Sequence, residues 1–274
     1  MENLIELIKA FILGVIQGIT EWLPISSTGH MKIFNAFWPM TSSEEFTNLF
    51  IVFIQIGSVL AVLLLFFKIL NPLGKSKEGS KNTLLLWVKI VVASLPAAVI
   101  GLLFDDLVDQ AMSGYMLIVI ASTLIIYGFL FIYVERKKIP VKVSHLKDIS
   151  FPQALAIGAF QTLAIIPGTS RSGATIVGSL WLGLSRTVAA EFSFMLSIPV
   201  LLGWGSIKFI KAGFIWSPLE WATLAVGFIT AFIVSLFVMK LLMSFVRKHN
   251  FTPFALYRIA LGLVILALVS FQIL

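Results

Sequence analysis

Long apolar runs separated by short polar segments dominate the chain. Six of these runs contain roughly 20 residues, the length that crosses a bilayer as an α-helix. They cover residues 45–68, 84–104, 115–134, 190–210, 221–243 and 254–273. The pattern therefore predicts an all-α polytopic membrane protein with six spanning helices.

Two further apolar segments, at residues 4–40 and 152–184, are each interrupted near the middle. The interruption is a proline followed by a turn rich in glycine and hydroxyl side chains, and a second apolar helix is expected after it. Non-helical backbone at membrane depth is tolerated where it is buried in protein or lines a wet cavity. We therefore predict two re-entrant helix pairs, each of which enters the membrane and returns on the same side.

The charged residues of the loops predict which side of the membrane each loop faces. Lysine and arginine gather in the loops at 69–83, 135–150 and 244–253, and the positive-inside rule places these loops in the cytoplasm. The loops near 105–114 and 211–220 hold almost no basic residues and are expected outside. The first helix pair then dips in from outside and the second from the cytoplasm, so their turns are expected to meet near the midplane.

The two halves of the chain are similar in sequence. The string from Gly14 to Gln17, followed by Pro24, has a counterpart in the string from Gly158 to Gln161, followed by Pro167. Because each half holds three crossings, an odd number, the second repeat is expected to be inverted relative to the first. Binding sites of such proteins lie at the interface of the repeats. The predicted division is a first repeat at 1–134, a basic cytoplasmic linker at 135–150 and a second repeat at 151–274.

The composition supports a membrane protein and argues against several other classes. Of the 274 residues, 59% are hydrophobic and 12% are charged, whereas soluble domains contain about 25% charged residues. The net charge of +7 does not indicate nucleic-acid binding, because the basic residues lie in loops where the positive-inside rule explains them. The absence of cysteine excludes disulfides, thiolate nucleophiles and cysteine metal sites. Glu2 and Glu6 precede the first lysine and no small-residue cleavage site follows, so the N-terminal segment is expected in the mature protein.

A short polar string in the first helix pair is the first candidate for chemistry. It runs from Ser26 to His30 and is preceded by Gln17 and Glu21, which lie four residues apart and share one helix face. A serine becomes a nucleophile when a base takes its proton, and an imidazole oriented by a carboxylate is one known solution. We predict that Ser27 reacts while Glu21 and His30 move the proton. The open alternatives are a structural, hydrogen-bonded glutamate and a serine that only caps a helix.

The second polar string runs from Pro167 to Thr175 and is centred on Arg171. The guanidinium is planar and always charged, and its hydroxyl neighbours would join it in binding phosphate oxygens. The turn leads into a helix, so backbone N–H groups would also face an anion. Phosphate binding is favoured over a salt bridge to Glu21 or Glu191 that fastens the two halves, although one arginine could do both. The residues predicted to bind substrate phosphate beside Arg171 are Gln17, Ser26, Thr28, Gly168, Ser170, Ser172 and Thr175.

The remaining charged residues receive no chemical role. They are Glu45, Arg186 and Glu191 at predicted helix ends, and Asp105, Asp106, Asp109 and His145 in predicted loops. No cluster of histidines and carboxylates has zinc spacing. A magnesium or calcium ion held partly by Glu21 and partly by substrate phosphates stays open.

The two polar strings together resemble the undecaprenyl-diphosphatase family, membrane enzymes of bacterial cell-wall lipid recycling that are linked to bacitracin resistance. The first family motif is Glu or Gln, three residues, Glu, and then Pro-x-Ser-Ser-Thr-Gly-His, which this chain matches with Gln17, Glu21, Pro24 and Ser26–His30. The second, Pro-Gly-x-Ser-Arg-Ser-x-x-Thr, is matched by residues 167–175. The resemblance spans nearly the whole chain. Many relatives carry Glu in place of Gln17, and this departure weakens any mechanism that needs two carboxylates here.

The resemblance implies removal of the terminal phosphate from undecaprenyl diphosphate, which recycles the lipid carrier for peptidoglycan synthesis. It also implies an inverted-repeat protein of the bacterial inner membrane with an active site that opens to the outer face. Homodimers and assistance by divalent cations are common in the family. A polyprenyl-phosphate flippase or secondary transporter is the alternative, because inverted repeats with broken helices are common in transporters.

Overall fold

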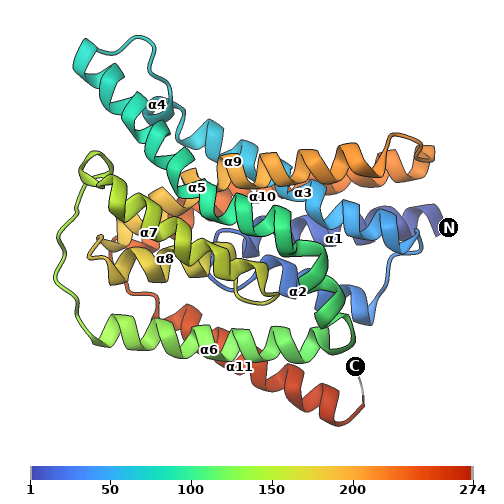
Figure 1. Cartoon of the computed structure of the whole chain (residues 1–274). Helices are drawn as coiled ribbons and strands as arrows, with labels where there is room; N and C mark the ends of the chain where they lie inside the picture. Colours follow the sequence, from blue (N-terminus) through green and yellow to red (C-terminus); the bar gives the residue numbers. More distant parts are fainter. Residues whose placement is uncertain (1, 273–274) are drawn as a thin grey trace.

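The computed structural model describes residues 2–272, except for the side chain of Asp109, and consists almost entirely of helices (Figure 1). The α-helices are α1 (Glu2–Thr20), α2 (Ser27–Phe37), α3 (Glu44–Leu65), α4 (Phe67–Leu70), α5 (Lys77–Met112), α6 (Met116–Arg136), α7 (Phe151–Thr162), α8 (Arg171–Trp181), α9 (Arg186–Ala212), α10 (Pro218–Val246) and α11 (Thr252–Ser270). Short 3-10 turns lie at Ser113–Tyr115, Leu146–Asp148 and Leu163–Ile165. Within the described range the only β pairing is an isolated bridge between Val143 and Leu184. The predicted all-α class is confirmed.

Seven helices of the described chain are long and apolar enough to cross a membrane. Six of them correspond to the six spans predicted from the sequence, and the seventh is α1, which has 19 residues. The sequence pattern places α1 and α2 in one interrupted segment, residues 4–40. Length and composition do not separate α1 from the spanning helices, so its re-entrant path stays a prediction.

Helix α5 is longer than the span predicted at 84–104. It begins after Ser76, whose hydroxyl accepts a hydrogen bond from the backbone N–H of Gly79 at 3.2 Å. No proline or glycine follows in residues 105–112, so nothing in the local sequence ends the helix there. The prediction that Asp105 and Asp106 lie in a loop is therefore wrong, because both lie on the last turns of α5.

Both interrupted segments form a helix, a turn and a second helix. Residues 21–26 connect α1 to α2, and residues 163–170 connect α7 to α8. In Figure 1, α1 starts at the side where the N-terminus lies, whereas the linker that leads into α7 runs along the opposite side. The two turns therefore approach the middle of the molecule from opposite ends.

Helices from the two halves pack against each other in matching pairs. α1 lies along α10 and α7 lies along α5, while α3 contacts α9 and α6 contacts α11 (Figure 1). Glycines allow close approach at the first two contacts: a Cβ on Gly14 would meet the carbonyl of Gly227, and one on Gly158 would meet the carbonyl of Ala93. Small residues commonly serve this purpose between membrane helices, where lipid tails are as apolar as the side chains.

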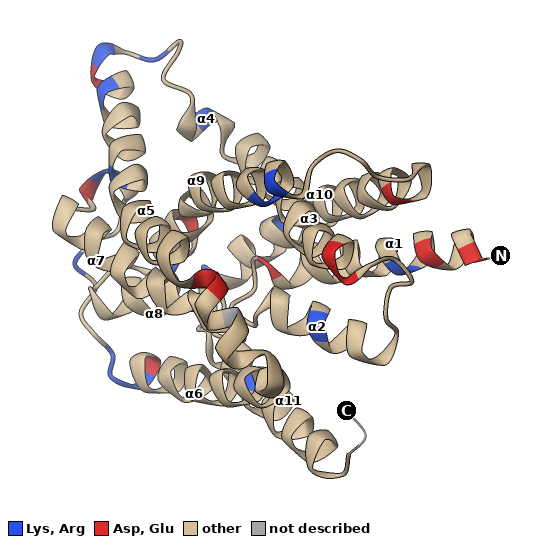
Figure 2. Ribbon diagram, turned by 45° about the vertical axis from the view of Figure 1, so that its right-hand side comes forward, with Lys and Arg blue, Asp and Glu red and all other residues tan. Residues whose placement is uncertain are grey.

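The charged side chains are unevenly distributed between the two ends of the helices. The loops at 69–83, 135–150 and 244–253 lie together at one end, and Lys and Arg are frequent there (Figure 2). The opposite end carries the N-terminus and several acidic residues (Figure 2). The three loops predicted to be cytoplasmic thus share one end of the molecule.

Candidate active site

The two turns that interrupt the helix pairs have the same local geometry. Ser26 caps α2 with a φ of 75°, and Ser170 caps α8 with a φ of 72°. Each hydroxyl accepts a hydrogen bond from a backbone N–H three residues on, that of Gly29 at 3.3 Å and that of Gly173 at 3.1 Å. A positive φ outside glycine costs about 1–3 kcal/mol, and such strained residues cluster at functional sites.

The first residue of each capped helix, Ser27 in α2 and Arg171 in α8, faces Glu21. Arg171 donates from Nε and Nη2 to Oε1 of Glu21 at 3.3 and 3.1 Å, and from Nη1 to the carbonyl of Ser193 at 2.8 Å. The Ser27 hydroxyl donates to Oε2 of Glu21 at 2.7 Å. One carboxylate therefore joins both turns, with one oxygen on the guanidinium and the other on the serine.

The Glu21–Arg171 ion pair is almost removed from solvent, since the two side chains are only 5% and 9% exposed. Gln17 donates from Nε2 to Oε2 of Glu21 and to the hydroxyl of Ser58, both at 3.3 Å. Ser172 donates to the backbone carbonyl of Glu21 at 3.0 Å. Such added hydrogen bonds matter because both buried charges have lost their hydration. The two turns are thus in direct contact, and the salt bridge weighed as the alternative for Arg171 is present.

A second arginine, Arg258 of α11, binds both turns and was not among the sequence candidates. It is fully buried, and its guanidinium donates to the carbonyl of Pro24 on the first turn at 2.8 Å. It also donates to the carbonyls of Gly168 and Thr169 on the second turn at 2.9 and 3.0 Å. The sequence signal was a single charge inside an apolar span, which commonly marks a functional or paired group.

His30 points away from the Glu21–Ser27 contact. Its Nδ1 lies 2.7 Å from the carbonyl of Ser26, and its Nε2 lies 2.8 Å from the hydroxyl of Tyr257. The two rings also stack, with centroids 5.7 Å apart. Among the hydrogen bonds of the described residues, Glu21 meets Ser27 directly and without the imidazole. The His30 imidazole therefore contacts Tyr257 of α11, whereas the Glu21 carboxylate lies directly beside the Ser27 hydroxyl.

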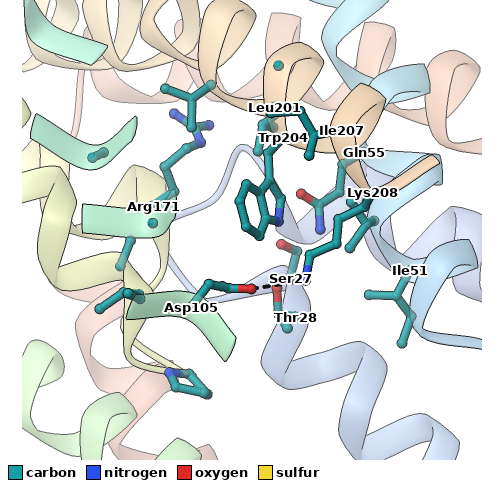
Figure 3. A pocket seen from close by; sticks show the side chains of 18 of the residues that line it. Ser27, Thr28, Ile51, Gln55, Asp105, Arg171, Leu201, Trp204, Ile207 and Lys208 are labelled. Carbon is teal, nitrogen blue, oxygen red and sulfur yellow. Dashed lines mark ion pairs between the residues drawn. The ribbon is translucent and has the colours of Figure 1, made fainter. Parts of the chain in front are cut away.

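A cavity of about 650 Å³ lies beside this cluster (Figure 3). The predicted site residues on its wall are Glu21, Ser26, Ser27, Thr28, Gly168, Ser170 and Arg171. Apolar side chains of α5 and α9, among them Leu102, Leu201 and Trp204, line much of the remainder. Ligand pockets are commonly of this size, about 300–1,000 Å³. The lining suits a ligand with an anionic head and an apolar tail.

Three predicted phosphate ligands instead bond to protein groups behind the wall. Gln17 and Ser172 bind Glu21 as described above, and the Thr175 hydroxyl lies 2.7 Å from that of Ser193. These residues support the position of the ion pair from behind. The cavity side is left to Ser27, Arg171 and their cavity-lining neighbours.

The chain is similar to known proteins over nearly its full length. Residues 10–264 match the family described as bacitracin resistance protein BacA. The chain belongs to this family. It is 48% identical to undecaprenyl-diphosphatase 1 of Clostridioides difficile strain 630 over 267 residues, which cover 97% of each chain. It is 47% identical to undecaprenyl-diphosphatase of Enterococcus faecalis over 274 residues, covering 98% of this chain and 99% of that one. The resemblance carried by the two polar strings is confirmed.

The protein groups at this BacA-family site do not by themselves fit a resident metal ion. Among the described residues, no group of three or more His, Cys, Asp or Glu side chains is arranged to hold one. Both carboxylate oxygens of Glu21 already accept hydrogen bonds, and Gln17 adds no charge. Hard cations such as Mg²⁺ prefer several oxygen ligands, so an ion here would depend largely on substrate phosphates.

Replacing Arg258 by Lys should loosen both turns, because one ammonium group cannot reach carbonyls on two separate turns as a planar guanidinium does. We expect faster amide hydrogen exchange at residues 24–29 and 168–173, measured by mass spectrometry on the protein in detergent. Arg136→Lys, the same change at the exposed end of α6, is the control and should leave exchange at both turns as it is in the wild type. Unchanged exchange in the R258K variant would show that the turns do not depend on Arg258.

Proposed function

We propose that the chain hydrolyses undecaprenyl diphosphate to undecaprenyl phosphate and inorganic phosphate. Relatives that match nearly its full length carry the name undecaprenyl-diphosphatase. The observation that carries the proposal is the contact of Glu21 with Ser27 and Arg171 on the wall of a cavity with apolar sides. A carboxylate beside a hydroxyl can accept its proton, and a guanidinium binds phosphate through paired hydrogen bonds.

In the proposed reaction, Arg171 holds the terminal phosphate while the Ser27 oxygen attacks its phosphorus. The new O–P bond forms as the bond to the bridging oxygen breaks, and undecaprenyl phosphate leaves with that oxygen. The Ser27 proton passes to Glu21, whose Oε2 lies 2.7 Å away, and from there to the leaving phosphate. Water then attacks the phosphoserine, loses a proton to Glu21, and Glu21 returns a proton to Ser27 as phosphate departs.

The chain's groups mainly position the substrate and stabilise charge, which is what phosphoryl transfer requires. Arg171 lies where charge develops on the equatorial oxygens, and the neighbouring hydroxyls of Thr28 and Ser170 on the same wall can donate to them. Glu21 holds Arg171 before the substrate enters. The guanidinium is therefore already oriented when the phosphate arrives.

A variant of this mechanism has no covalent step. Glu21 activates a water molecule, which attacks the phosphorus directly, and Ser27 only donates a hydrogen bond to the phosphate. The short Ser27–Glu21 hydrogen bond favours serine attack, because the base already holds the proton that must leave.

We also propose an inverted-topology repeat, with three spans and one re-entrant helix pair in each half. Its support is the matching helix contacts, the two identically capped turns and the entry of α1 and α7 from opposite ends (Figure 1). In this topology, the end that carries the N-terminus faces outward in a bacterial inner membrane, because the basic loops share the other end. The cavity extends to Lys211 and Ala212 at the outer end of α9, so the site would open to the outer face.

We propose that the polyprenyl tail leaves the cavity sideways into lipid. Leu102 of α5 lines the cavity and is also 62% exposed, which supports an apolar opening beside α5. An apolar tail in such an opening stays out of water while its diphosphate head lies in the polar part of the cavity.

Phosphate release by the purified protein separates the enzyme from the transporter alternative. In detergent, where no second compartment exists, the wild type should release inorganic phosphate from undecaprenyl diphosphate, whereas a transporter without hydrolytic activity releases none. Glu21→Gln and Arg171→Ala should each lower kcat at least about a hundredfold, since each removes a group that acts in the transition state. Glu220→Gln, the same change in the first turn of α10 and outside the residues that line the cavity, is the control and should keep wild-type turnover.

The reaction of Ser27 can be tested by rapid quenching followed by mass spectrometry. We expect a phosphate on Ser27 during turnover, and loss of both this adduct and measurable release in Ser27→Ala. Near-normal turnover of the S27A variant would instead establish direct attack by water.

The topology can be tested by cysteine labelling, because the wild-type chain has no cysteine and gives no background. A single cysteine at Lys138 should react with a membrane-impermeant maleimide only after the cells are opened, whereas one at Ile215 should react in intact spheroplasts. Labelling of both positions from the same side would exclude the proposed orientation.

A further inference from the structure

An ion pair spans the cavity between α5 and α9. The ammonium group of Lys208 lies 3.1 Å from a carboxylate oxygen of Asp105 and 3.5 Å from one of Asp106. Lys208 and Asp105 both line the cavity that also contains Ser27 and Thr28 (Figure 3). Lys208 also lies over the ring of Trp204, 4.8 Å from its centroid. Any ligand that reaches Ser27 from the outer end therefore passes a charged pair.

This pair differs from the buried pair of Glu21 and Arg171. The side chains of Lys208 and Asp105 are 30% and 25% exposed, so water reaches both charges. Ion pairs with solvent access contribute little to stability, about 0–1 kcal/mol, because the attraction is screened. The partner of Lys208 can therefore be exchanged at low cost, whereas breaking a buried pair leaves an uncompensated charge.

The charge on the outer part of the cavity favours an anion as the new partner. Outside the Glu21–Arg171 pair, the charged residues of the cavity wall are Lys32, Glu45, Asp105, Lys208 and Lys211, so three cations stand against two carboxylates. Cationic side chains on the walls of a cleft raise the local concentration of anions and speed their association. Among the described side chains, Lys208 forms ion pairs with Asp105 and Asp106 between α9 and α5 at the cavity.

Both helices that carry the pair contain an internal proline on the side toward the cytoplasm. Pro96 lies within α5 and Pro199 within α9, in each case before the paired residue. A proline removes one backbone hydrogen bond of the helix and allows it to bend there.

We propose that Lys208 is a substrate-binding residue that exchanges Asp105 and Asp106 for the diphosphate of the entering prenyl lipid. This inference rests on the proposed diphosphatase function and adds a residue outside both polar strings. Lys208 binds the diphosphate head near the outer end of the cavity, and the head then moves on to Arg171. The two carboxylates compete with the substrate for the same ammonium group.

The competition predicts effects of opposite sign, measured as steady-state phosphate release from undecaprenyl diphosphate in detergent. Lys208→Gln should raise KM about tenfold with kcat within about a factor of two, because one charged contact is lost before the chemical step. A double variant with Asp105→Asn and Asp106→Asn should lower KM, because the substrate then no longer has to displace a carboxylate from Lys208. Lys208→Arg keeps the charge and should retain a KM within about twofold of the wild type.

If the ion pair of Lys208 with Asp105 and Asp106 only stabilises the packing of α5 against α9, we expect a different result. Loss of either partner would then act in the same direction, with lower unfolding temperature and lower kcat in both the K208Q and the D105N/D106N variants, and this outcome would overturn the proposal. An unchanged KM in K208Q would also overturn it. Lys240→Gln, the same change at an exposed position of α10, is the control and should keep the wild-type KM. If the wild type itself releases no phosphate, the diphosphatase function fails instead, and this result is distinct from an active wild type with an unaltered K208Q.

Discussion

The buried contact between the Glu21 carboxylate and the Arg171 guanidinium is the interaction on which the site depends. Each charge has lost its water, so each is tolerated only because the other is present and hydrogen bonds satisfy the rest of its polar atoms. The two residues lie 150 positions apart, and the pair forms only when both halves of the chain fold together. In the proposed reaction Ser27 of one half attacks and Arg171 of the other half binds the phosphate, so the proposed chemistry and the assembly of the halves depend on the same contact.

Arg258 binds the backbone of the two turns, whereas Glu21 and Arg171 join their side chains. A turn between two helices leaves backbone carbonyls without helical partners, and buried carbonyls need other hydrogen-bond donors. The guanidinium of Arg258 donates to carbonyls on both turns, so one side chain from α11 satisfies both interruptions. These carbonyls lie within two residues of Ser26 and Ser170, which both have a positive φ. The two turns are thus joined by a third element, α11, which lies outside both helix pairs.

Local features of the sequence predicted the long spanning helices and the polar cluster of the candidate site. The features that were not predicted depend mainly on contacts between elements far apart in the chain. Apolar runs and polar groups at depth are local features, and they predicted the long spans and the cluster around Glu21. Arg258 was missed because its role depends on which helix packs behind the turns. The direction of His30 was missed because helical spacing predicts a shared face, whereas its partner Tyr257 comes from α11. The continuation of α5 through Asp105 was missed because acidic residues after an apolar run also suit a loop.

The ion pairs of Arg171 and Lys208 differ in how far they are buried. This difference suits Arg171 to the proposed chemical step and Lys208 to the proposed binding of the entering substrate. The pair of Arg171 is buried, and its guanidinium also donates to the carbonyl of Ser193, which favours the fixed orientation that charge stabilisation in a transition state requires. The pair of Lys208 is solvated, and its ammonium group has no fixed planar geometry, which favours exchange of partners. On the proposed route, the diphosphate head meets Lys208 first and Arg171 last. This order divides the loss of its hydration into two stages, of which the second takes place where Arg171 can replace the lost water.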